Sequence, residues 1–256
     1  MITFPNCKIN LGLHVVGKRP DGYHDLETIF LPVMDMCDEL EIVEGPLEMR
    51  QDGITLDNAP DDNLCMKAWR LLHEEFGIPT VSIRLKKNIP FGAGLGGGSS
   101  DAAFTLKMLN EIFSLGLDNS ALEQRAAKLG ADCAFFIKNQ PAYATGIGDM
   151  LTPLEFSFFN FQFSFVIEIP DGEHVSTKEA YLGLNRDLFG VQRPDLRKAM
   201  KQPIEEWRNL IVNDFEASVF PTHPAIAELK DDMYRRGALY ASMTGSGAAV
   251  FGMFPK

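Results

Sequence analysis

The feature that most constrains this chain is a glycine-rich stretch, in which five of the seven residues from 92 to 98 are glycine. Alternating apolar and polar residues at 81–86 predict a strand before it, and apolar residues at helical spacing from Ala102 predict a helix after it. Glycine loses more conformational entropy on ordering than any other residue, and a plain turn needs only one or two glycines. The high glycine content of residues 92–98 therefore indicates a backbone that closely approaches a ligand, rather than a turn with glycines for tight packing.

A loop that leads from a strand into a helix is suited to binding an anion, because unpaired amides and the helix dipole meet there. Ser99, Ser100 and Asp101 add oxygens that can cap the helix or bind a metal. The Walker type of phosphate loop is excluded, since no lysine follows Gly98, and the protein-kinase signatures H-R-D and D-F-G do not occur in the sequence. A Rossmann site is a weak alternative: residues 92–97 satisfy G-x-G-x-x-G, but no second strand ending in an acid follows.

The composition is that of a globular protein, with 256 residues of which 45% are apolar and 23% charged. The net charge of −11 argues against a nucleic-acid partner but not against a small anionic ligand held by backbone amides. The four cysteines lie far apart, as in proteins whose thiols stay reduced. No signal-peptide pattern is present, and the uncharged tract 237–255 centres on a turn sequence, so we expect a cytoplasmic protein with no membrane partner.

The order of predicted elements favours an α+β fold with two lobes and mixed or antiparallel sheets, because the early strands come in runs with short turns. Strands are predicted at 8–16, 28–34, 39–43, 81–86, 156–169 and 248–253, and helices at 62–76, 102–116, 120–130, 176–184, 195–199 and 225–235. Ser120 and Glu123 are expected to form a capping box that opens one of these helices. We place the lobes at residues 1–152 and 153–256.

Four segments, in order along the chain, resemble motifs of the GHMP small-molecule kinases, which include galactokinase and the homoserine and mevalonate kinases. The glycine-rich loop resembles the nucleotide loop of this family, and residues 243–251 resemble its C-terminal motif. Residues 6–13 and 19–28 resemble the branch that phosphorylates a diphosphocytidyl sugar alcohol in the non-mevalonate isoprenoid precursor pathway. The resemblance implies a kinase with an active site between its two lobes.

The resemblance also implies that the γ-phosphoryl group of ATP is transferred to an alcohol, with Lys8 and Asp132 as the catalytic residues. Asp132 would accept the hydroxyl proton, while Lys8 holds the carboxylate ionised. The alternatives are a helix N-cap for Asp132 and a solvated strand face for Lys8. The family usually has a valine–proline pair after this aspartate, whereas Cys133 and Ala134 stand here, and we interpret Cys133 as a packed thiol.

The binding positions follow from the same resemblance. ATP and magnesium are the expected cofactors, with Ser99 or Ser100 as the first metal ligand to consider. The cofactor-binding residues are those of the loop, namely Pro90, Phe91, Gly92, Ala93, Gly94, Leu95, Gly96, Gly97, Gly98, Ser99 and Ser100. The substrate-binding residues are Asn10, Tyr23, His24 and Tyr181, with Tyr23 expected to stack on the cytosine base. A second glycine turn lies beside the phosphates or closes a simple hairpin, and it comprises Thr244, Gly245, Ser246 and Gly247.

Two other functions stay open on the sequence alone. A GHMP kinase acting on a different alcohol is disfavoured by the Asp-Gly-Tyr-His box at residues 21–24. A non-catalytic nucleotide-binding homologue is disfavoured by the presence of both Lys8 and Asp132. In each case the expected partners are small molecules, and the expected state is a monomer or homodimer.

Overall fold

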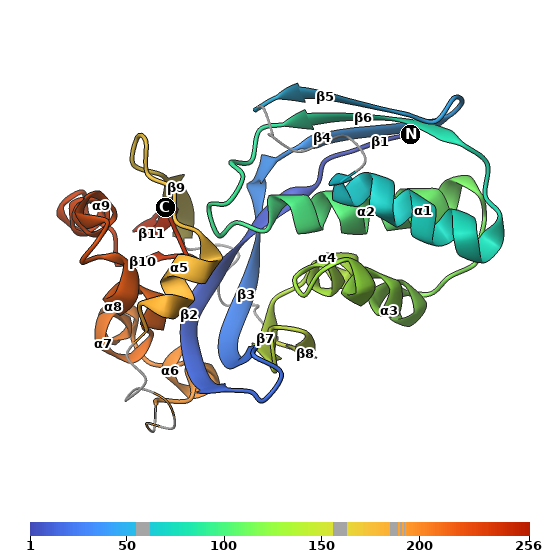
Figure 1. The fold of residues 1–256 in the computed structure, drawn as a ribbon. Helices are drawn as coiled ribbons and strands as arrows, with labels where there is room; N and C mark the ends of the chain where they lie inside the picture. Colours follow the sequence, from blue (N-terminus) through green and yellow to red (C-terminus); the bar gives the residue numbers. More distant parts are fainter. Residues whose placement is uncertain (55–61, 156–162, 185–188, 190, 192) are drawn as a thin grey trace. The chain divides into compact units, whose positions relative to one another are not determined.

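The computed structural model describes residues 1–54, 62–155, 163–184, 189, 191 and 193–256. These residues form two compact units, each assembled from separate segments of the chain (Figure 1). The first unit comprises Met1–Lys8, Pro32–Phe91 and Gly96–Gln140, and the second comprises Ile9–Leu31, Gly92–Leu95 and Pro141–Lys256. The lobes predicted from the sequence, residues 1–152 and 153–256, are by contrast contiguous. The units are not contiguous because the long strands β2 (Asn6–Lys18) and β3 (His24–Cys37) each pass from one unit into the other.

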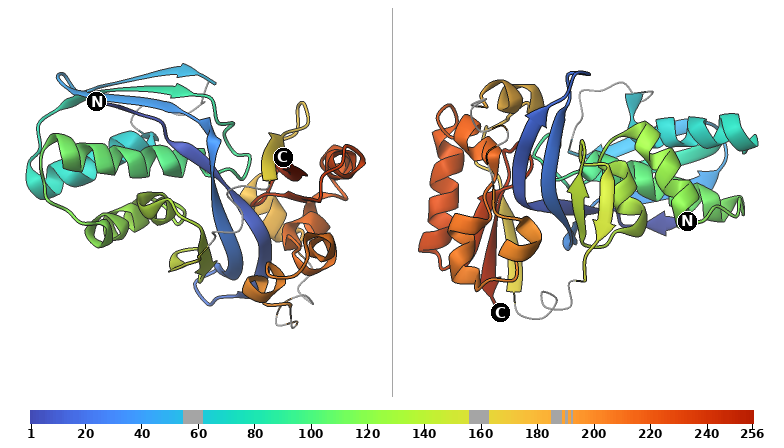
Figure 2. Two further views of the ribbon diagram at one scale, coloured as in Figure 1. Left: turned by 180° about the vertical axis from the view of Figure 1, so that it is seen from behind. Right: turned by 90° about the horizontal axis from the view of Figure 1, so that it is seen from below.

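The first unit contains a four-stranded sheet in the order β1-β4-β6-β5. Its strands are β1 (Ile2–Thr3), β4 (Glu39–Glu44), β5 (Glu48–Gly53) and β6 (Val81–Lys87). Strands β5 and β6 pair in parallel, which requires a crossover, and α1 (Leu64–Phe76) lies between them in the chain. Helices α1 and α2 (Gly97–Ile112) cover one face of the sheet, with α3 (Asn119–Leu129) and α4 (Cys133–Lys138) beyond them (Figures 1 and 2). The predicted strand at 81–86 and the helices α1 and α2 are confirmed.

The start of α3 differs from the prediction. Its N-cap is Asp118, whose carboxylate accepts a hydrogen bond from the backbone N–H of Ala121 at 2.8 Å. The predicted capping box of Ser120 and Glu123 is therefore wrong, because the helix has already begun at Asn119. Asp118 and Ser120 are both suitable N-cap residues, and Asp118, which comes first, accepts the hydrogen bond of the unpaired amide.

The second unit contains two sheets. An antiparallel sheet in the order β10-β11-β9 consists of β9 (Phe163–Glu168), β10 (Tyr240–Met243) and β11 (Val250–Pro255). The strand–turn–strand prediction for residues 237–255 is confirmed by the antiparallel pairing of β10 with β11. Strand β9 confirms the end of the predicted strand at 156–169, whose first residues, 156–162, lie outside the described residues. The other sheet has the order β2-β3-β7-β8, with β7 (Ala142–Thr145) and β8 (Met150–Pro153).

Short helices complete the second unit. They are α5 (Thr177–Leu182), α6 (Leu196–Ala199), a 3₁₀ turn (Ile204–Glu206), α7 (Trp207–Leu210), α8 (Asp214–Val219) and α9 (Pro224–Arg235). The helices α5, α6 and α9 were predicted, whereas α7 and α8 were not. The buried core includes Met233 from α9, Phe215 from α8, and Ala241 and Val250 from the sheet. This core therefore joins the C-terminal helices to the strands on either side of the second glycine turn.

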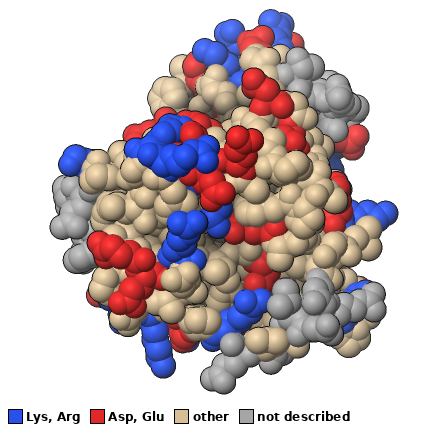
Figure 3. All heavy atoms as spheres, turned by 90° about the vertical axis from the view of Figure 1, so that its left-hand side faces the viewer, with Lys and Arg blue, Asp and Glu red and all other residues tan. Residues whose placement is uncertain are grey.

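The surface carries charges of both signs. Acidic and basic side chains are interspersed on the face of the molecule seen in Figure 3. Ion pairs of the second unit show the same mixing, with Arg236 2.8 Å from Glu168 and Lys230 2.6 Å from Glu216. Within the described ranges, no helix is both long and apolar enough to cross a membrane.

Candidate active site

Lys8 and Asp132 lie together in the first unit. The Nζ atom of Lys8 is 3.5 Å from Oδ2 of Asp132. Lys8 is only 3% exposed in β2, so the alternative of a solvated strand face is wrong. Asp132 stands at the N-cap position of α4, but its side chain makes no capping bond there and is 32% exposed. The pair thus combines a buried cation with a carboxylate that an incoming molecule can reach.

The loop residues of the first unit pack closely around Lys8. Gly96, at the N-cap of α2, has a positive φ of +72°, and a Cβ atom there would lie 3.1 Å from Cγ of Lys8. The same Cβ would lie 3.2 Å from the ring of Phe136 on α4. A glycine is therefore required at this point both by its backbone conformation and by the approach of the lysine. The start of α2 and the Lys8–Asp132 pair consequently lie next to each other.

Cys133 lies directly after Asp132 and is fully buried. Burial raises the pKa of its thiol to about 11, while a hydrogen bond with Ser99 acts in the opposite direction. The thiol is therefore protonated at neutral pH and is not a nucleophile. This agrees with the interpretation of Cys133 as a packed side chain.

The loop residues of the second unit contact the second glycine turn. A Cβ atom on Gly94 would lie 2.1 Å from the carbonyl oxygen of Thr244, and φ at Gly94 is +77°. The backbone N–H of Ala249 donates to the carbonyl of Ala93 at 3.2 Å. Residues 244–247 do connect two strands of a hairpin, as the simpler alternative held, and they also pack directly on the glycine-rich loop.

Asn10 is held by polar groups of the second unit. Its backbone N–H donates to Oγ1 of Thr244 at 2.9 Å, and its side-chain amide donates to Oγ1 of Thr28 at 2.9 Å. Asn10 is 2% exposed and lies inside β2, so it is not a cap at a strand end. The structure therefore joins Asn10 to the second glycine turn.

The aromatic residues predicted for the substrate also lie in the second unit. The rings of His24 and Tyr181 stack with centroids 4.5 Å apart, and Tyr181 meets Phe215 edge-on at 4.8 Å. Partial burial, with the nearby charge of Lys18, lowers the pKa of His24, which favours a neutral imidazole. Tyr23 is 62% exposed, at the end of a turn in which its N–H donates to the carboxylate of Asp21 at 3.1 Å. An exposed aromatic face and a stacked histidine thus stand next to each other in the chain.

A buried ion cluster that the sequence analysis missed flanks the glycine-rich loop, and it consists of Lys87, Asp38 and Asp101. The ammonium of Lys87 donates to Oδ2 of Asp101 at 2.7 Å and also bonds Oδ2 of Asp38. The other oxygen of Asp38 accepts from the backbone N–H groups of Asn88 and Ile89, at 2.6 and 2.8 Å. The cluster therefore fixes the chain at the start of the loop and ties it to the first turns of α2.

The protonation of this cluster follows from its burial. All three side chains are no more than 3% exposed. Burial raises the pKa of Asp101 to about 7, although the charge of Lys87 opposes this. Burial alone would lower the pKa of Lys87, but the two carboxylates outweigh it and the pKa is raised. Asp101 is thus engaged with Lys87 and does not serve as the free capping or metal-binding group considered from the sequence.

The two serines proposed as metal ligands differ in their surroundings. Ser100 is fully buried, and its hydroxyl makes no hydrogen bond with the described residues. Ser99 is partly exposed. No group of three or more His, Cys, Asp or Glu side chains placed to hold a metal occurs among the described residues. Because Mg²⁺ keeps several of its waters and is bound together with phosphate oxygens, the accessible hydroxyl of Ser99 fits it better than that of Ser100.

The fold and the loop define a class of small-molecule kinase, and comparison with known proteins bears this out. Residues 63–140 match the family model described as "GHMP kinases N terminal domain", and residues 194–256 match "GHMP kinases C terminal". The chain has the architecture of a GHMP kinase: a mevalonate kinase from Methanococcus jannaschii superposes with a TM-score of 0.75 at 16% identity, covering 99% of this chain and 90% of that one.

More similar relatives narrow the family. The chain is 49% identical to the 4-diphosphocytidyl-2-C-methyl-D-erythritol kinase of Bacteroides thetaiotaomicron, and the match covers 99% of this chain and 92% of that protein. Identity to the enzyme of the same name from Porphyromonas gingivalis is 47%, with the same coverage. A crystal structure of 4-(cytidine 5′-diphospho)-2C-methyl-D-erythritol kinase superposes with a TM-score of 0.84 at 33% identity, over 99% of this chain and 90% of that one. The chain belongs to the 4-diphosphocytidyl-2-C-methyl-D-erythritol kinase family.

Proposed function

We propose that this protein transfers the γ-phosphoryl group of ATP to the 2-hydroxyl of 4-diphosphocytidyl-2-C-methyl-D-erythritol, a step in the non-mevalonate synthesis of isoprenoid precursors. Family membership at 49% identity supports the choice of substrate. The observation that carries the chemistry is the 3.5 Å contact between Lys8 and Asp132 next to the start of α2.

Lys8 and Asp132 are the residues that act on the acceptor alcohol. The carboxylate of Asp132 is accessible, so it can accept the proton of the hydroxyl as that oxygen attacks the γ-phosphorus. The buried ammonium of Lys8 lies 3.5 Å from this carboxylate and can neutralise negative charge that builds up on the phosphoryl oxygens. Phosphoryl transfer depends mainly on such positioning and charge neutralisation, and this pair supplies both.

The glycine-rich loop, residues 90–100, is the proposed site of the triphosphate. The first amides of α2 have no partner within the helix and are directed at its N-terminal end, where the helix dipole also favours an anion. Ser99 would hold magnesium, which would offset the negative charge of the phosphates. Residues 244–247 would support the loop through the contacts of Thr244 with Gly94.

Tyr23, His24, Asn10 and Tyr181 are the proposed substrate residues. Tyr23 offers an exposed ring on which a cytosine base can stack. Tyr181 already stacks on His24, so we assign it the role of fixing the histidine ring, whose nitrogen atoms can then bond the edge of the base. Asn10 is positioned through Thr28 and Thr244. A cytoplasmic location and a monomeric or homodimeric state complete the proposal.

The test is release of ADP in a coupled assay on mixing the purified protein with ATP, Mg²⁺ and the diphosphocytidyl substrate. Turnover with this substrate, and none with homoserine, mevalonate or galactose, is the expected result. Turnover with one of those alcohols alone would replace the proposal with a GHMP kinase of different specificity. Binding of ATP without phosphorylation of any of them would leave a non-catalytic homologue.

A further inference from the structure

The short segment 213–216 of the second unit has the sequence Asn-Asp-Phe-Glu, and its three polar side chains are buried or partly buried. Asn213 is 3% exposed and Asp214 is 5% exposed. Asp214 accepts from the backbone N–H of Val15 at 2.9 Å, and Glu216 accepts from the backbone N–H of Met243 at 2.9 Å. Each of these side chains therefore bonds the backbone of another segment, and none of them belongs to the proposed catalytic or binding residues.

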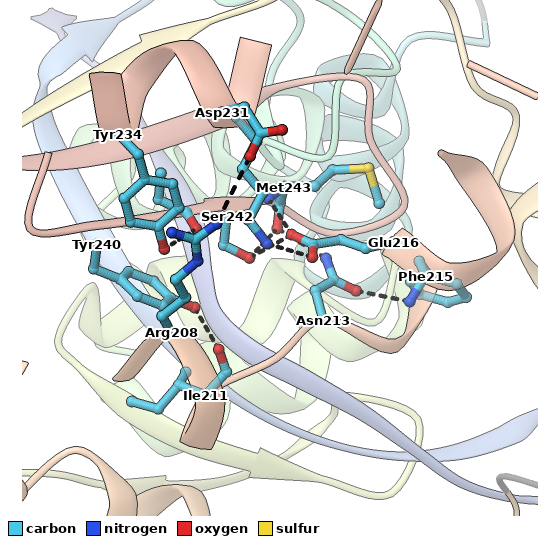
Figure 4. A network of polar contacts seen from close by, with 12 residues as sticks. Arg208, Ile211, Asn213, Phe215, Glu216, Asp231, Tyr234, Tyr240, Ser242 and Met243 are labelled. Atoms are coloured by element: carbon cyan, nitrogen blue, oxygen red, sulfur yellow. Dashed lines mark hydrogen bonds and ion pairs between the residues drawn. The ribbon is translucent and has the colours of Figure 1, made fainter. Parts of the chain in front are cut away.

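Asn213 holds the second glycine turn from both sides of Thr244. Its Nδ2 atom donates to the carbonyl oxygen of Met243 at 2.8 Å (Figure 4). The same atom donates to the carbonyl oxygen of Gly245 at 2.9 Å. Its Oδ1 atom accepts from the backbone N–H of Phe215 at 3.0 Å, which orients the amide group. Two donors and one acceptor are used, and no other side chain of this shape supplies that combination.

Glu216 adds a second attachment to the same strand end. Its Oε1 atom accepts from the N–H of Met243 and from Oγ of Ser242, at 2.9 and 3.0 Å (Figure 4). Its other oxygen pairs with Lys230 at 2.6 Å. The N–H and the C=O of Met243 are therefore both bound by residues of one four-residue segment. This leaves little freedom at the point where β10 becomes the turn.

The turn in turn contacts the proposed nucleotide and substrate residues. The carbonyl of Thr244 faces Gly94 so closely that a Cβ atom there would lie 2.1 Å away. The hydroxyl of Thr244 accepts from the backbone N–H of Asn10 at 2.9 Å. A shift of the turn by even a fraction of an ångström would therefore move or release Gly94 and Asn10.

We propose that Asn213 is a positioning residue, which holds residues 243–245 against Gly94 of the nucleotide loop and against Asn10 and so sets the affinity for ATP. The proposal rests on the proposed function, because it takes the loop to bind the triphosphate. If Asn213 has only a structural role, its loss lowers the stability of the protein without a selective effect on the affinity for ATP.

The test compares two variants, each of which loses buried hydrogen bonds from a side chain to backbone carbonyls. Asn213→Asp keeps the shape of the side chain but replaces two donors with an oxygen that faces two carbonyls. Tyr240→Phe is the control, because it also removes a buried hydrogen bond to a backbone carbonyl, that of Ile211 at 2.9 Å (Figure 4). The Tyr240 hydroxyl contacts Ser242, but the carbonyls that Asn213 holds are those of Met243 and Gly245. The measurements are the Kd for a non-hydrolysable ATP analogue, the KM values for both substrates and the thermal midpoint of each variant.

Asn213→Asp is expected to weaken binding of the ATP analogue about tenfold or more, as follows from leaving buried carbonyls without donors. Tyr240→Phe is expected to leave that Kd within about twofold at a comparable loss of thermal stability. Equal effects of the two variants on the Kd, or no effect of Asn213→Asp, would overturn the positioning role. If Asn213→Asp does not fold, Asn213→Ser removes both donors to the carbonyls of Met243 and Gly245 without placing a carboxylate against them, and unchanged affinity there would count equally against the proposal.

The wild-type chain separates this proposal from the one on which it rests. A wild type that neither binds the analogue nor turns over defeats the proposed function and the positioning role together. A wild type that binds and turns over, with Asn213→Asp unchanged in affinity, defeats the positioning role alone.

Discussion

Replacement of Lys87 by methionine tests whether the buried ion cluster holds the first unit together at the nucleotide loop. Methionine keeps the length and apolar stem of the side chain but removes the ammonium that bonds both Asp38 and Asp101. The two carboxylate oxygens share one nitrogen, so they lie no more than about 5 Å apart, and at an effective dielectric of about 20 their repulsion is about 3 kcal/mol. Loss of one partner from a buried pair typically costs about 3–5 kcal/mol, which agrees with this figure.

The matched control removes a carboxylate instead. Lys87→Met leaves two buried carboxyl groups without a cation, so they must either repel each other or share a proton, whereas Asp101→Asn leaves a balanced pair of Lys87 with Asp38. Asp101→Asn is therefore expected to lie within about 1 kcal/mol of wild type, on the scale of a neutral hydrogen bond. Urea unfolding at pH 8 gives the free energies. For a protein of this size, Lys87→Met should lower the thermal midpoint by about 10 °C.

The pH dependence of the free energy of unfolding gives an independent test of the ion cluster. Burial raises the folded-state pKa of Asp101 from its ordinary 3.8 to about 7, so between these values the folded chain holds a proton that the unfolded chain has lost. More protons bound in the folded state means that the stability contributed by this group falls as pH rises across that window, and the loss is complete above about pH 7. Asp101→Asn should flatten this slope. Equal stability of the Lys87 and Asp101 variants at pH 8, or an unchanged slope in Asp101→Asn, would refute the reasoning.

Three further substitutions test the proposed roles. Asp132→Ala should lower kcat by about 10²–10⁴-fold, as for loss of a general base, with little change in ATP affinity by titration; a near-normal rate contradicts the assignment. Tyr23→Ala should raise the KM of the cytidyl substrate about tenfold or more without lowering the thermal midpoint, because the ring is 62% exposed, and an unchanged KM would remove it from the site. Gly94→Ala should weaken ATP binding, because its Cβ would overlap the Thr244 carbonyl. Gly172→Ala is the control and should leave ATP binding unchanged, because Gly172 has the same φ of +77° but open space around it. Equal effects of the two variants on ATP binding would contradict this reasoning.

Elements with a strong local pattern could be predicted from the sequence. The alternation in β6 and the helical spacing in α1 and α2 are local signals, and both were sufficient. Strand β5 lacks such a signal, because its residues Glu48–Gly53 are mostly polar and only partly buried. Its place depends on parallel pairing with β6, which lies about thirty residues further along the chain and is reached through α1. Tertiary pairing, and not propensity, makes that segment a strand.

The residues of the candidate site also differ in whether a local signal predicts them. Lys8 and Asp132 were found through their motifs, but neither residue alone distinguishes a catalytic role from a cap or a surface side chain. Asp38 and Asn213 could not be found, because their partners lie far away in the sequence. Asp38 bonds Lys87 and the two residues that follow it, and Asn213 bonds a turn some thirty residues later. Asn213 follows the apolar residues 210–212, which signals a buried polar group without showing its partner, whereas Asp38 stands next to Glu39 in an acidic stretch and leaves no such signal.

Most glycines of the glycine-rich loop are explained by contacts within the protein itself. Protein atoms already crowd four of its five glycines, since a Cβ would lie 2.7 Å from His174 at Gly92, 2.1 Å from Thr244 at Gly94, 3.1 Å from Lys8 at Gly96 and 2.9 Å from Ile89 at Gly97. These contacts explain the absence of side chains there without any ligand.

Gly98 is different, because the nearest atom to its Cβ would be a methyl of Leu64 at 3.9 Å, an ordinary contact. It is the second residue of α2, where alanine is a better helix former than glycine, and none of the described residues near it requires a glycine. Close approach of a phosphate, as proposed for this loop, would supply a reason for the glycine. Gly98→Ala is therefore expected to raise the free energy of unfolding by about 0.5–1 kcal/mol and yet to weaken binding of an ATP analogue. A variant that is more stable and binds the analogue as well as wild type would show that no ligand comes close to this part of the loop.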